Sequence, residues 1–331
     1  MNELQQLGDF LRQLLAPVLG EHPAIENLEQ LTGGAAAQTW AFTACTVSEN
    51  HELILRLGRD QQQFGAALSK RLEADLIRAA KKSGVLAPEV LIVLADGGAF
   101  GEGFVMRRVA GEALPQRILR ETRYAGARAG LAEQCAFNLS AIHAIALDAV
   151  PALPRLHALK QLELYRDAYL GYPFRSPVFE FAFRWLERHA HLERPSAVVH
   201  GDFRNGNLLI DEGGITAVLD WELAHIGDPM EDLGWLCVNS WRFGQRDLPV
   251  GGFGQRTELY TAYAQASGNT VNADIVHYWE VFGTLKWGVI CLYQADAHMS
   301  GTEPSLERAA IGRRVSEVEI DLISLFKGQQ P

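Results

Sequence analysis

The sequence predicts an α+β protein with two lobes: a small antiparallel β-rich lobe with one main helix, then a larger, mostly helical lobe. Two observations carry this prediction. Short strand-like runs separated by turn residues dominate the first third of the chain. Apolar residues then recur at helical spacing over most of the remainder. We place the boundary near residue 107, which gives lobes of residues 1–107 and 108–331.

Length and composition narrow the class of protein. The 331 residues suffice for two lobes, and 48% hydrophobic with 21% charged residues is ordinary for a globular chain. A net charge of -10 argues against nucleic acid as a partner. No apolar run is long enough for a membrane span, and the start lacks the basic region of a signal peptide. We therefore expect a cytoplasmic protein and leave its oligomeric state open.

Four cysteines are spread along the chain without a C-x-x-C pair. This spacing is typical of free thiols in a reducing compartment and gives no indication of a disulfide framework or a zinc site.

The elements of the first lobe follow in order. Leucines at helical spacing over residues 4–18 predict an opening amphipathic helix. Three strands are expected between residues 25 and 57, the first two joined by a small-residue turn. The stretch LSKRLEADLIRAAKKSG predicts a helix that ends at Gly84. Two more strands around a glycine-rich turn complete the lobe.

The second lobe is predicted to be helical on both sides of one β-like stretch. Apolar stripes predict helices in LPRLHALKQLELYRDAYLGY, VFEFAFRWLERHAHLE, TELYTAYAQASG, ADIVHYWEVFGTLKWGVICLYQADAHMSG and AIGRRVSEVEIDLISLFKG, besides one through Leu131 to Ile145. The β-like stretch, residues 197–229, holds two short apolar runs around the turn DEGG, which predict a hairpin. Its open end brings Asn207 near Asp220.

His200 and Asp202 stand shortly before Asn207, so several polar side chains converge at one end of this hairpin. Oxygen ligands of this kind suit Mg²⁺, whereas zinc would ask for more histidine or cysteine. Asp202 is placed to accept a proton from a hydroxyl. Phosphoryl transfer needs these two parts, a base and metal ligands that neutralise phosphate charge.

The pattern H-x-D-x-x-x-x-N at His200, Asp202 and Asn207, followed by Asp220 in LDWE, resembles the aminoglycoside phosphotransferase family of protein-kinase-like enzymes. The segments VVHGDFRNGNLLI and GDPMEDLGWL look most like the kinase-like domains associated with acyl-CoA dehydrogenases. The resemblance implies a protein-kinase-like fold and an ATP-dependent kinase. It implies Asp202 as catalytic base, His200 as a brace of its loop, and Asn207 with Asp220 as Mg²⁺ ligands.

The small lobe offers candidates for nucleotide binding. Gly33 and Gly34 open a small-residue turn that lets the backbone approach phosphates. Arg56 at the end of the third strand and Glu73 on the helix take the places of the Lys–Glu ion pair of protein kinases. By the same resemblance, a hinge at FVMRRVAGE reads adenine through backbone groups of Arg107 and Val109.

The acceptor is left open by the family, whose members phosphorylate many alcohols. Carboxylates are not in excess on the helices expected around the acceptor, and residues 277–294 are rich in aromatics, with Lys286 among them. We expect a small-molecule acceptor with an apolar or acyl part, such as a hydroxy acid; a buried core helix explains the same pattern equally well. An aminoglycoside or macrolide kinase, a nucleotide-binding pseudokinase and a metal-dependent hydrolase are the alternatives.

Overall fold

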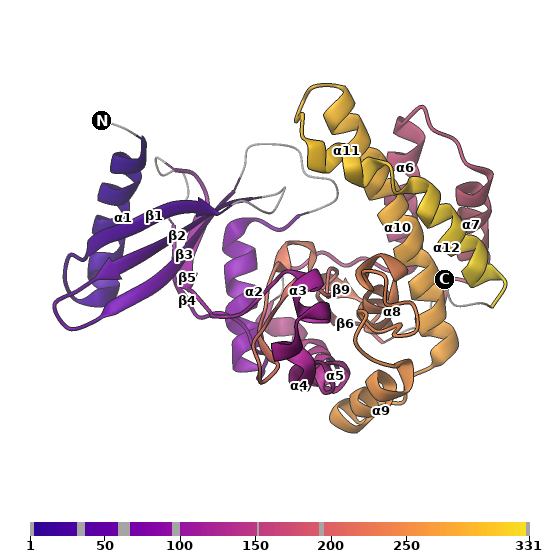
Figure 1. The fold of residues 1–331 in the computed structure, drawn as a ribbon, viewed down its shortest axis with the longest axis horizontal. Coiled ribbons are helices and arrows are strands. Elements are labelled where there is room, and N and C mark those ends of the chain that lie inside the picture. Colours follow the sequence, from indigo (N-terminus) through magenta and orange to yellow (C-terminus); the bar gives the residue numbers. More distant parts are fainter. Residues whose placement is uncertain are drawn as a thin grey trace.

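The computed structural model describes residues 3–31, 37–58, 67–94, 100–150, 152–191 and 195–328. Two lobes are evident, a β-sheet lobe at the N-terminal end and a helical lobe beyond it (Figure 1). This confirms the predicted α+β, protein-kinase-like fold class.

The small lobe is built on a five-stranded antiparallel sheet in the order β1-β2-β3-β5-β4. Its strands are β1 (Ala24–Leu31), β2 (Ala37–Cys45), β3 (Asn50–Gly58), β4 (Val90–Val93) and β5 (Gly103–Arg107), with α2 (Lys70–Lys82) between β3 and β4. The predicted sequence of three strands, one helix and two strands is therefore confirmed.

Opposite faces of this sheet carry different helices. Helix α1 (Glu3–Leu19) buries Leu7, Leu11 and Leu15 against one face, in a core that also holds Phe42 and Leu53. Helix α2 buries its own apolar residues in the other, larger core, which continues into the second lobe. Alternation of side chains along the strands produces these two faces. The predicted opening helix is thus a structural support.

Helix α2 has clear signals at both ends. The Ser69 hydroxyl caps the first turn by accepting from the backbone N–H of Leu72, and Gly84 follows the last turn with a φ of +92°. The predicted end at Gly84 agrees with this geometry.

The large lobe is mostly helical. Its helices are α3 (Pro115–Arg120), α4 (Ala125–Arg128), α5 (Leu131–His143), α6 (Ala158–Gly171), α7 (Pro177–Arg188), α8 (Met230–Cys237), α9 (Arg256–Ser267), α10 (Ala273–Met299), α11 (Leu306–Gly312) and α12 (Val315–Phe326). The sequence predicts one helix over AIGRRVSEVEIDLISLFKG, but the chain breaks between α11 and α12, so this prediction is wrong. Gly312 ends α11, and an added Cβ there would lie 2.7 Å from Ala295 on α10.

Two small sheets lie inside this helical lobe and position the polar residues of the site. Strands β7 (Leu208–Ile210) and β8 (Ile215–Val218) form the predicted hairpin. Strands β6 (Ala197–Val199) and β9 (His225–Gly227) pair beside it, before and after the hairpin in the chain.

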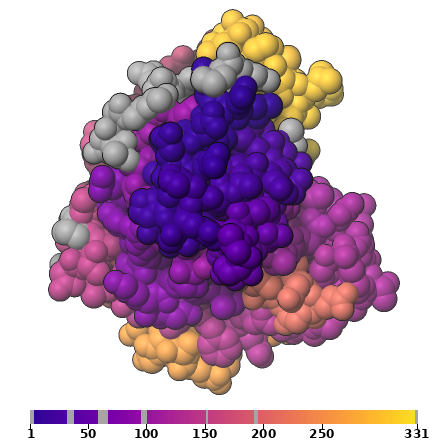
Figure 2. Space-filling view, turned by 90° about the vertical axis from the view of Figure 1, so that its left-hand side faces the viewer, coloured from indigo at the N-terminus to yellow at the C-terminus, as the bar shows by residue number. Residues whose placement is uncertain are grey.

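The space-filling view onto the small lobe shows N-terminal residues in front of a broader second lobe (Figure 2). Helix α9 and the C-terminal helices extend beyond the small lobe at opposite edges, as Figure 1 also shows. In the part of the chain that the structure describes, no helix combines the length and apolar character of a membrane span.

Candidate active site

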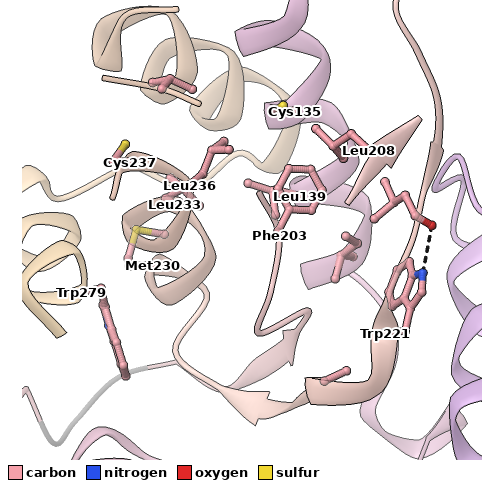
Figure 3. Close-up of a cluster of buried hydrophobic side chains, with 14 of the residues drawn as sticks. Cys135, Leu139, Phe203, Leu208, Trp221, Met230, Leu233, Leu236, Cys237 and Trp279 are labelled. Atoms are coloured by element: carbon pink, nitrogen blue, oxygen red, sulfur yellow. Dashed lines mark hydrogen bonds between the residues drawn. The ribbon is translucent and has the colours of Figure 1, made fainter. Parts of the chain in front are cut away.

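The loop between β6 and β7 is shaped by a glycine and anchored by a phenylalanine. Gly201 has a φ of +78°, and a Cβ there would lie 2.4 Å from the Leu223 carbonyl oxygen. Phe203 is fully buried, and in Figure 3 its ring lies beside Leu139 of α5, with Leu208 of β7 nearby. Both residues help to fix the loop, because glycine permits the close backbone approach and the ring fills the core.

His200 contacts the backbone of the loop and of the hairpin through both ring nitrogens. Its buried imidazole Nδ1 accepts from the backbone N–H of Asp202 at 3.2 Å, and its Nε2 contacts the Leu219 carbonyl at 3.1 Å. These partners assign the neutral tautomer with the proton on Nε2. Burial lowers the pKa of His200, which keeps the ring neutral.

Asp232 on α8 also contacts the backbone of this loop. Its two carboxylate oxygens accept from the backbone N–H groups of His200 and Gly201 at 2.8 and 2.9 Å. His143 contacts the same carboxylate at 3.1 Å. Burial would raise the pKa of Asp232, but His143 and the backbone N–H of His200 outweigh burial and lower it. The loop is therefore held by a charged, fully buried acceptor.

Asp202 projects from this loop with three side-chain donors around it. Oδ2 accepts from the Asn207 amide at 2.6 Å, while Oδ1 accepts from the Trp235 indole at 2.8 Å and from Arg204 Nε at 3.0 Å. The carboxylate keeps 14% of its side-chain surface exposed. Its direction is thus fixed while one edge stays accessible.

Asn207 and Asp220 lie together at the open end of the hairpin, as the sequence predicts. The Leu219 N–H donates to the Asn207 carbonyl at 2.8 Å, which closes the hairpin next to Asp220. Asp220 has left-handed backbone angles, with φ 67° and ψ 62°, and the chain continues from it into the short 3₁₀ turn Trp221–Leu223.

Arg56 connects the small lobe with this hairpin. Its NH2 group donates to Asp220 Oδ1 at 3.0 Å, and its NH1 group lies 3.5 Å from Glu73 Oε1. Burial would raise the pKa of Asp220, but Arg56 outweighs burial and lowers it. The predicted Arg56–Glu73 ion pair is present, but the hydrogen bond of Arg56 goes to Asp220.

Two further charged residues join this cluster and were missed in the sequence. Lys70 Nζ donates to Glu73 Oε2 at 2.7 Å and lies 3.7 Å from Glu222 Oε2. Burial and nearby Asp220 raise the pKa of Glu222 to about 8. The spacing of Lys70 and Glu73, three residues apart on a helix, is the signal that could have found the first of them.

Of the remaining predicted site residues, the structure describes some and not others. Gly33 and Gly34 lie outside the described residues. Arg107 ends β5 with its side chain exposed and paired to Glu89 at 2.8 Å. For Val109, no hydrogen-bond partner of its backbone N–H or carbonyl is found among the described residues. The hinge roles of Arg107 and Val109 stay predictions.

The aromatic helix α10 differs from the expectation of an acceptor pocket. Tyr278, Trp279 and Phe282 are buried in the core, and the Trp279 indole donates to Asp228 at 3.1 Å. Lys286 is buried as well and donates to the Gly201 carbonyl at 2.9 Å. The core-helix explanation of this pattern is therefore correct for most of α10.

The donor set fits a nucleotide with magnesium. Among the described residues no group of three or more His, Cys, Asp or Glu side chains could hold a metal ion. Mg²⁺ in phosphoryl-transfer sites needs only one or two carboxylates, since waters and phosphate oxygens complete its shell. The side chain of Asp220 is 30% exposed, so its carboxylate is accessible to an ion. The buried atoms Arg56 Nε and Glu222 Oε2 have no hydrogen-bond partner within the described part of the chain. Asn207 and Asp220 would hold the ion.

Comparison with known proteins agrees with this geometry. The model of the phosphotransferase enzyme family matches residues 27–268. The mouse protein named acyl-CoA dehydrogenase family member 10 is 27% identical over 247 residues, which is 70% of this chain and 22% of that protein. The chain therefore spans about a fifth of the length of this relative.

Solved structures share the fold. A putative aminoglycoside phosphotransferase from Ralstonia eutropha superposes with a TM-score of 0.76 at 22% identity, covering 99% of both chains. Spectinomycin phosphotransferase, solved with ADP and spectinomycin, gives a TM-score of 0.65 at 14% identity, covering 96% of this chain and 98% of its own.

Proposed function

Because the chain belongs to the phosphotransferase enzyme family, we propose that it is an ATP-dependent small-molecule kinase that phosphorylates a hydroxyl group. The observation that carries this proposal is the convergence of Asp202, Asn207 and Asp220 at one hairpin end, with Arg56 reaching them from the small lobe. Phosphoryl transfer requires a base or orienting group together with charge-neutralising groups at the phosphates.

Asp202 is the proposed base. Its Oδ1 is held by Trp235 and Arg204 and its Oδ2 by Asn207, so the carboxylate is oriented before the acceptor arrives. In this role it orients the acceptor hydroxyl and takes its proton as the hydroxyl oxygen bonds to the γ-phosphorus, while the bond from that phosphorus to the bridging oxygen breaks and ADP leaves. Hydrogen bonds from donors on both oxygens keep Asp202 in one rotamer.

Asn207 and Asp220 are the proposed magnesium ligands, and Arg56 is the proposed phosphate cation. Bound magnesium would neutralise charge on the phosphates. Arg56 has a guanidinium suited to two-point contact with phosphate oxygens, and its Nε is free of partners among the described residues. Gly33 and Gly34 are proposed to approach the phosphates through their backbone.

The adenine is proposed to bind at the hinge through backbone groups of Arg107 and Val109. Within the described part of the chain, the backbone N–H and carbonyl of Val109 have no hydrogen-bond partner, which supports this placement. The neighbour solved with ADP supports a nucleotide of this kind as donor.

The acceptor is proposed to be a hydroxylated small molecule with an apolar or acyl part. Trp235 and Arg204 contact Asp202, and Arg204 lies 4.5 Å from the centre of the Trp241 ring. The side chains around the proposed base are thus aromatic and cationic. A polycationic acceptor would meet like charge there, whereas an apolar or anionic group would be favoured.

Two alternatives compare differently with the structure. An aminoglycoside kinase is supported by neighbours such as the spectinomycin enzyme. A nucleotide-binding pseudokinase, the alternative of another class, would need no base; the hydrogen bonds that orient Asp202 argue against it.

The test is an ATP-consumption assay over a panel of alcohols. The panel contains short and medium hydroxy acids, free and as thioesters, with aminoglycosides and macrolides beside them. We expect acceptor-dependent ADP release with the hydroxy acids or thioesters, lost in Asp202→Asn. Preference for an antibiotic, at a kcat/KM of about 10⁴ M⁻¹s⁻¹ or more, would favour the resistance enzyme instead. ATP binding without turnover on any acceptor would favour the pseudokinase.

A further inference from the structure

Helix α2 carries a buried lysine whose position none of the proposed roles explains. Lys70 is 3% exposed and stands at the first position of α2, directly after the Ser69 cap. A buried lysine loses its hydration, so it needs a partner of opposite charge. Its Nζ donates to Glu73 Oε2 at 2.7 Å, the shortest contact in the charged cluster at the lobe boundary.

Arg56 lies farther from the Glu73 carboxylate than Lys70 does. The distance from Arg56 NH1 to Glu73 Oε1 is 3.5 Å, and that oxygen has no hydrogen-bond partner among the described residues. The NH2 group of Arg56 instead donates to Asp220 at 3.0 Å and lies 3.7 Å from Glu222. Thus the fully buried Glu73 carboxylate has two cations nearby but receives its hydrogen bond from Lys70.

We propose that Lys70 is the positioning residue that holds Glu73 and the first turn of α2, so that Arg56 is left to bind nucleotide phosphates. The second half of this proposal rests on the proposed kinase function. In a kinase with one cation at this place, the same side chain must serve both the helix carboxylate and the phosphates. Here two cations divide these tasks.

The surroundings of Lys70 explain how it serves this role. Its backbone N–H donates to Glu102 Oε2 at 3.2 Å, and the Leu68 N–H donates to the Glu222 carbonyl at 2.9 Å. The start of α2 is therefore attached to the strand side of the small lobe and to the segment after Asp220. Without Lys70, Arg56 would be the nearer cation left for the buried Glu73 carboxylate and would be drawn toward it, away from the phosphates.

Two double-mutant cycles test the division of tasks without any ligand. One cycle uses Lys70→Met with Glu73→Gln, the other Arg56→Met with Glu73→Gln, and each measures the unfolding equilibrium in denaturant. We expect the 70–73 pair to be non-additive by a factor of about ten or more, and the 56–73 pair to be nearly additive. The double variant Lys70→Met/Glu73→Gln should recover stability, because no buried carboxylate is left unpaired. Equal or larger coupling of the 56–73 pair would overturn the proposal.

A binding measurement separates positioning from a merely structural role. ATP and adenosine are titrated into wild type, Lys70→Met and Glu73→Gln. We expect Lys70→Met to lose about tenfold in ATP affinity and little in adenosine affinity, because Arg56 then turns to the unpaired Glu73 carboxylate, and we expect Glu73→Gln to change neither affinity much. Equal losses for both ligands would contradict positioning. Lys70→Gln, which keeps a hydrogen-bond donor, replaces Lys70→Met if the latter does not fold.

Different results would contradict the kinase proposal and the Lys70 proposal. If wild type binds no ATP, the kinase proposal is contradicted, while the unliganded cycles still decide whether Lys70 or Arg56 holds Glu73.

Discussion

Asp220 combines an acidic side chain with a backbone conformation that few residues adopt. Its φ of 67° is left-handed, and among non-glycine residues asparagine and aspartate tolerate this region best. Arg56 donates to its carboxylate from the other lobe at 3.0 Å. A substitution that tests the carboxylate alone must therefore preserve the left-handed turn.

Asp220→Asn meets this requirement, since the amide keeps the shape and the turn but loses the charge. We expect magnesium to tighten ATP binding in wild type and this gain to fall by about 10–100-fold or more in the variant, because a charged ligand is lost. Titrations of ATP with magnesium and with a chelator measure the gain. A variant that retains the full magnesium effect would show that Asp220 is not a ligand.

His225 on β9 is a buried histidine that the structure provides with two acceptors. Nδ1 contacts the Leu223 carbonyl at 3.0 Å and Nε2 contacts Glu231 Oε2 at 3.1 Å. Nε2 also lies 3.2 Å from the Gln161 side-chain nitrogen, which donates to the same Glu231 oxygen at 2.6 Å. Burial alone would lower the pKa of His225, but Glu231 and the Leu223 carbonyl outweigh burial and raise it.

This raised pKa predicts a pH dependence of stability. The folded state binds the proton more tightly than the unfolded state, whose histidine pKa is about 6.5, so the stabilisation is complete below that pH. It is lost as the pH rises through the folded pKa. We expect the difference in unfolding free energy between wild type and His225→Gln to shrink from about pH 6 to pH 9, by at most about 1.4 kcal/mol per pH unit. A difference that is constant or grows with pH would contradict the protonated state.

At the scale of elements, the loop between β6 and β7 depends on one close backbone approach. Gly201 and Gly301 have similar φ values, +78° and +75°. A Cβ at Gly201 would meet the Leu223 carbonyl oxygen at 2.4 Å, whereas a Cβ at Gly301 would meet nothing within 4 Å. Alanine substitutions at the two glycines therefore separate the cost of a left-handed backbone from the cost of a steric clash of the added Cβ.

Gly301→Ala should destabilise the protein by about 1 kcal/mol through its left-handed backbone alone. Gly201→Ala should cost about 1–3 kcal/mol more, because the loop must shift away from Leu223. It should also reduce turnover, since Asp202 follows directly. Denaturant unfolding of both variants measures the difference; equal destabilisation would mean that the loop accommodates the methyl group.

Elements with their own local signals could be predicted from the sequence. The β7–β8 hairpin was found because two apolar runs flank a turn, and α2 because a stripe ends at Gly84. The break between α11 and α12 was not found; beside it, Gly312 approaches Ala295 on another helix. Such a contact leaves no periodic pattern in the sequence.

Some residues of the candidate site could likewise be predicted from the sequence, and others could not. His200, Asp202, Asn207 and Asp220 lie within one short stretch, so their spacing made them visible. Trp235 and Lys286 contact this loop from α8 and α10, and nothing local distinguishes them from core residues. Arg204 was visible in the motif, but its contact with Asp202 needed the structure.

At the scale of the whole molecule, the two lobes meet at the charged cluster. Arg56 of β3 reaches Asp220, and the Leu68 N–H donates to the Glu222 carbonyl. The larger buried core is also continuous from the sheet through α2 into the helical lobe. The boundary at residue 107 therefore stays a prediction: β5 ends there, although the core does not.

The central claim is that this junction transfers a phosphoryl group with Asp202 as base. The most direct measurement is single-turnover transfer from labelled ATP to the best acceptor, with ATP affinity measured in parallel, for wild type and Asp202→Asn. Asp211→Asn, the same change in the exposed hairpin turn, is the matched control. We predict that Asp202→Asn loses about 10²–10⁴-fold in rate while magnesium-dependent ATP affinity is retained, and that the control behaves as wild type. A near-normal rate in Asp202→Asn would contradict the claim.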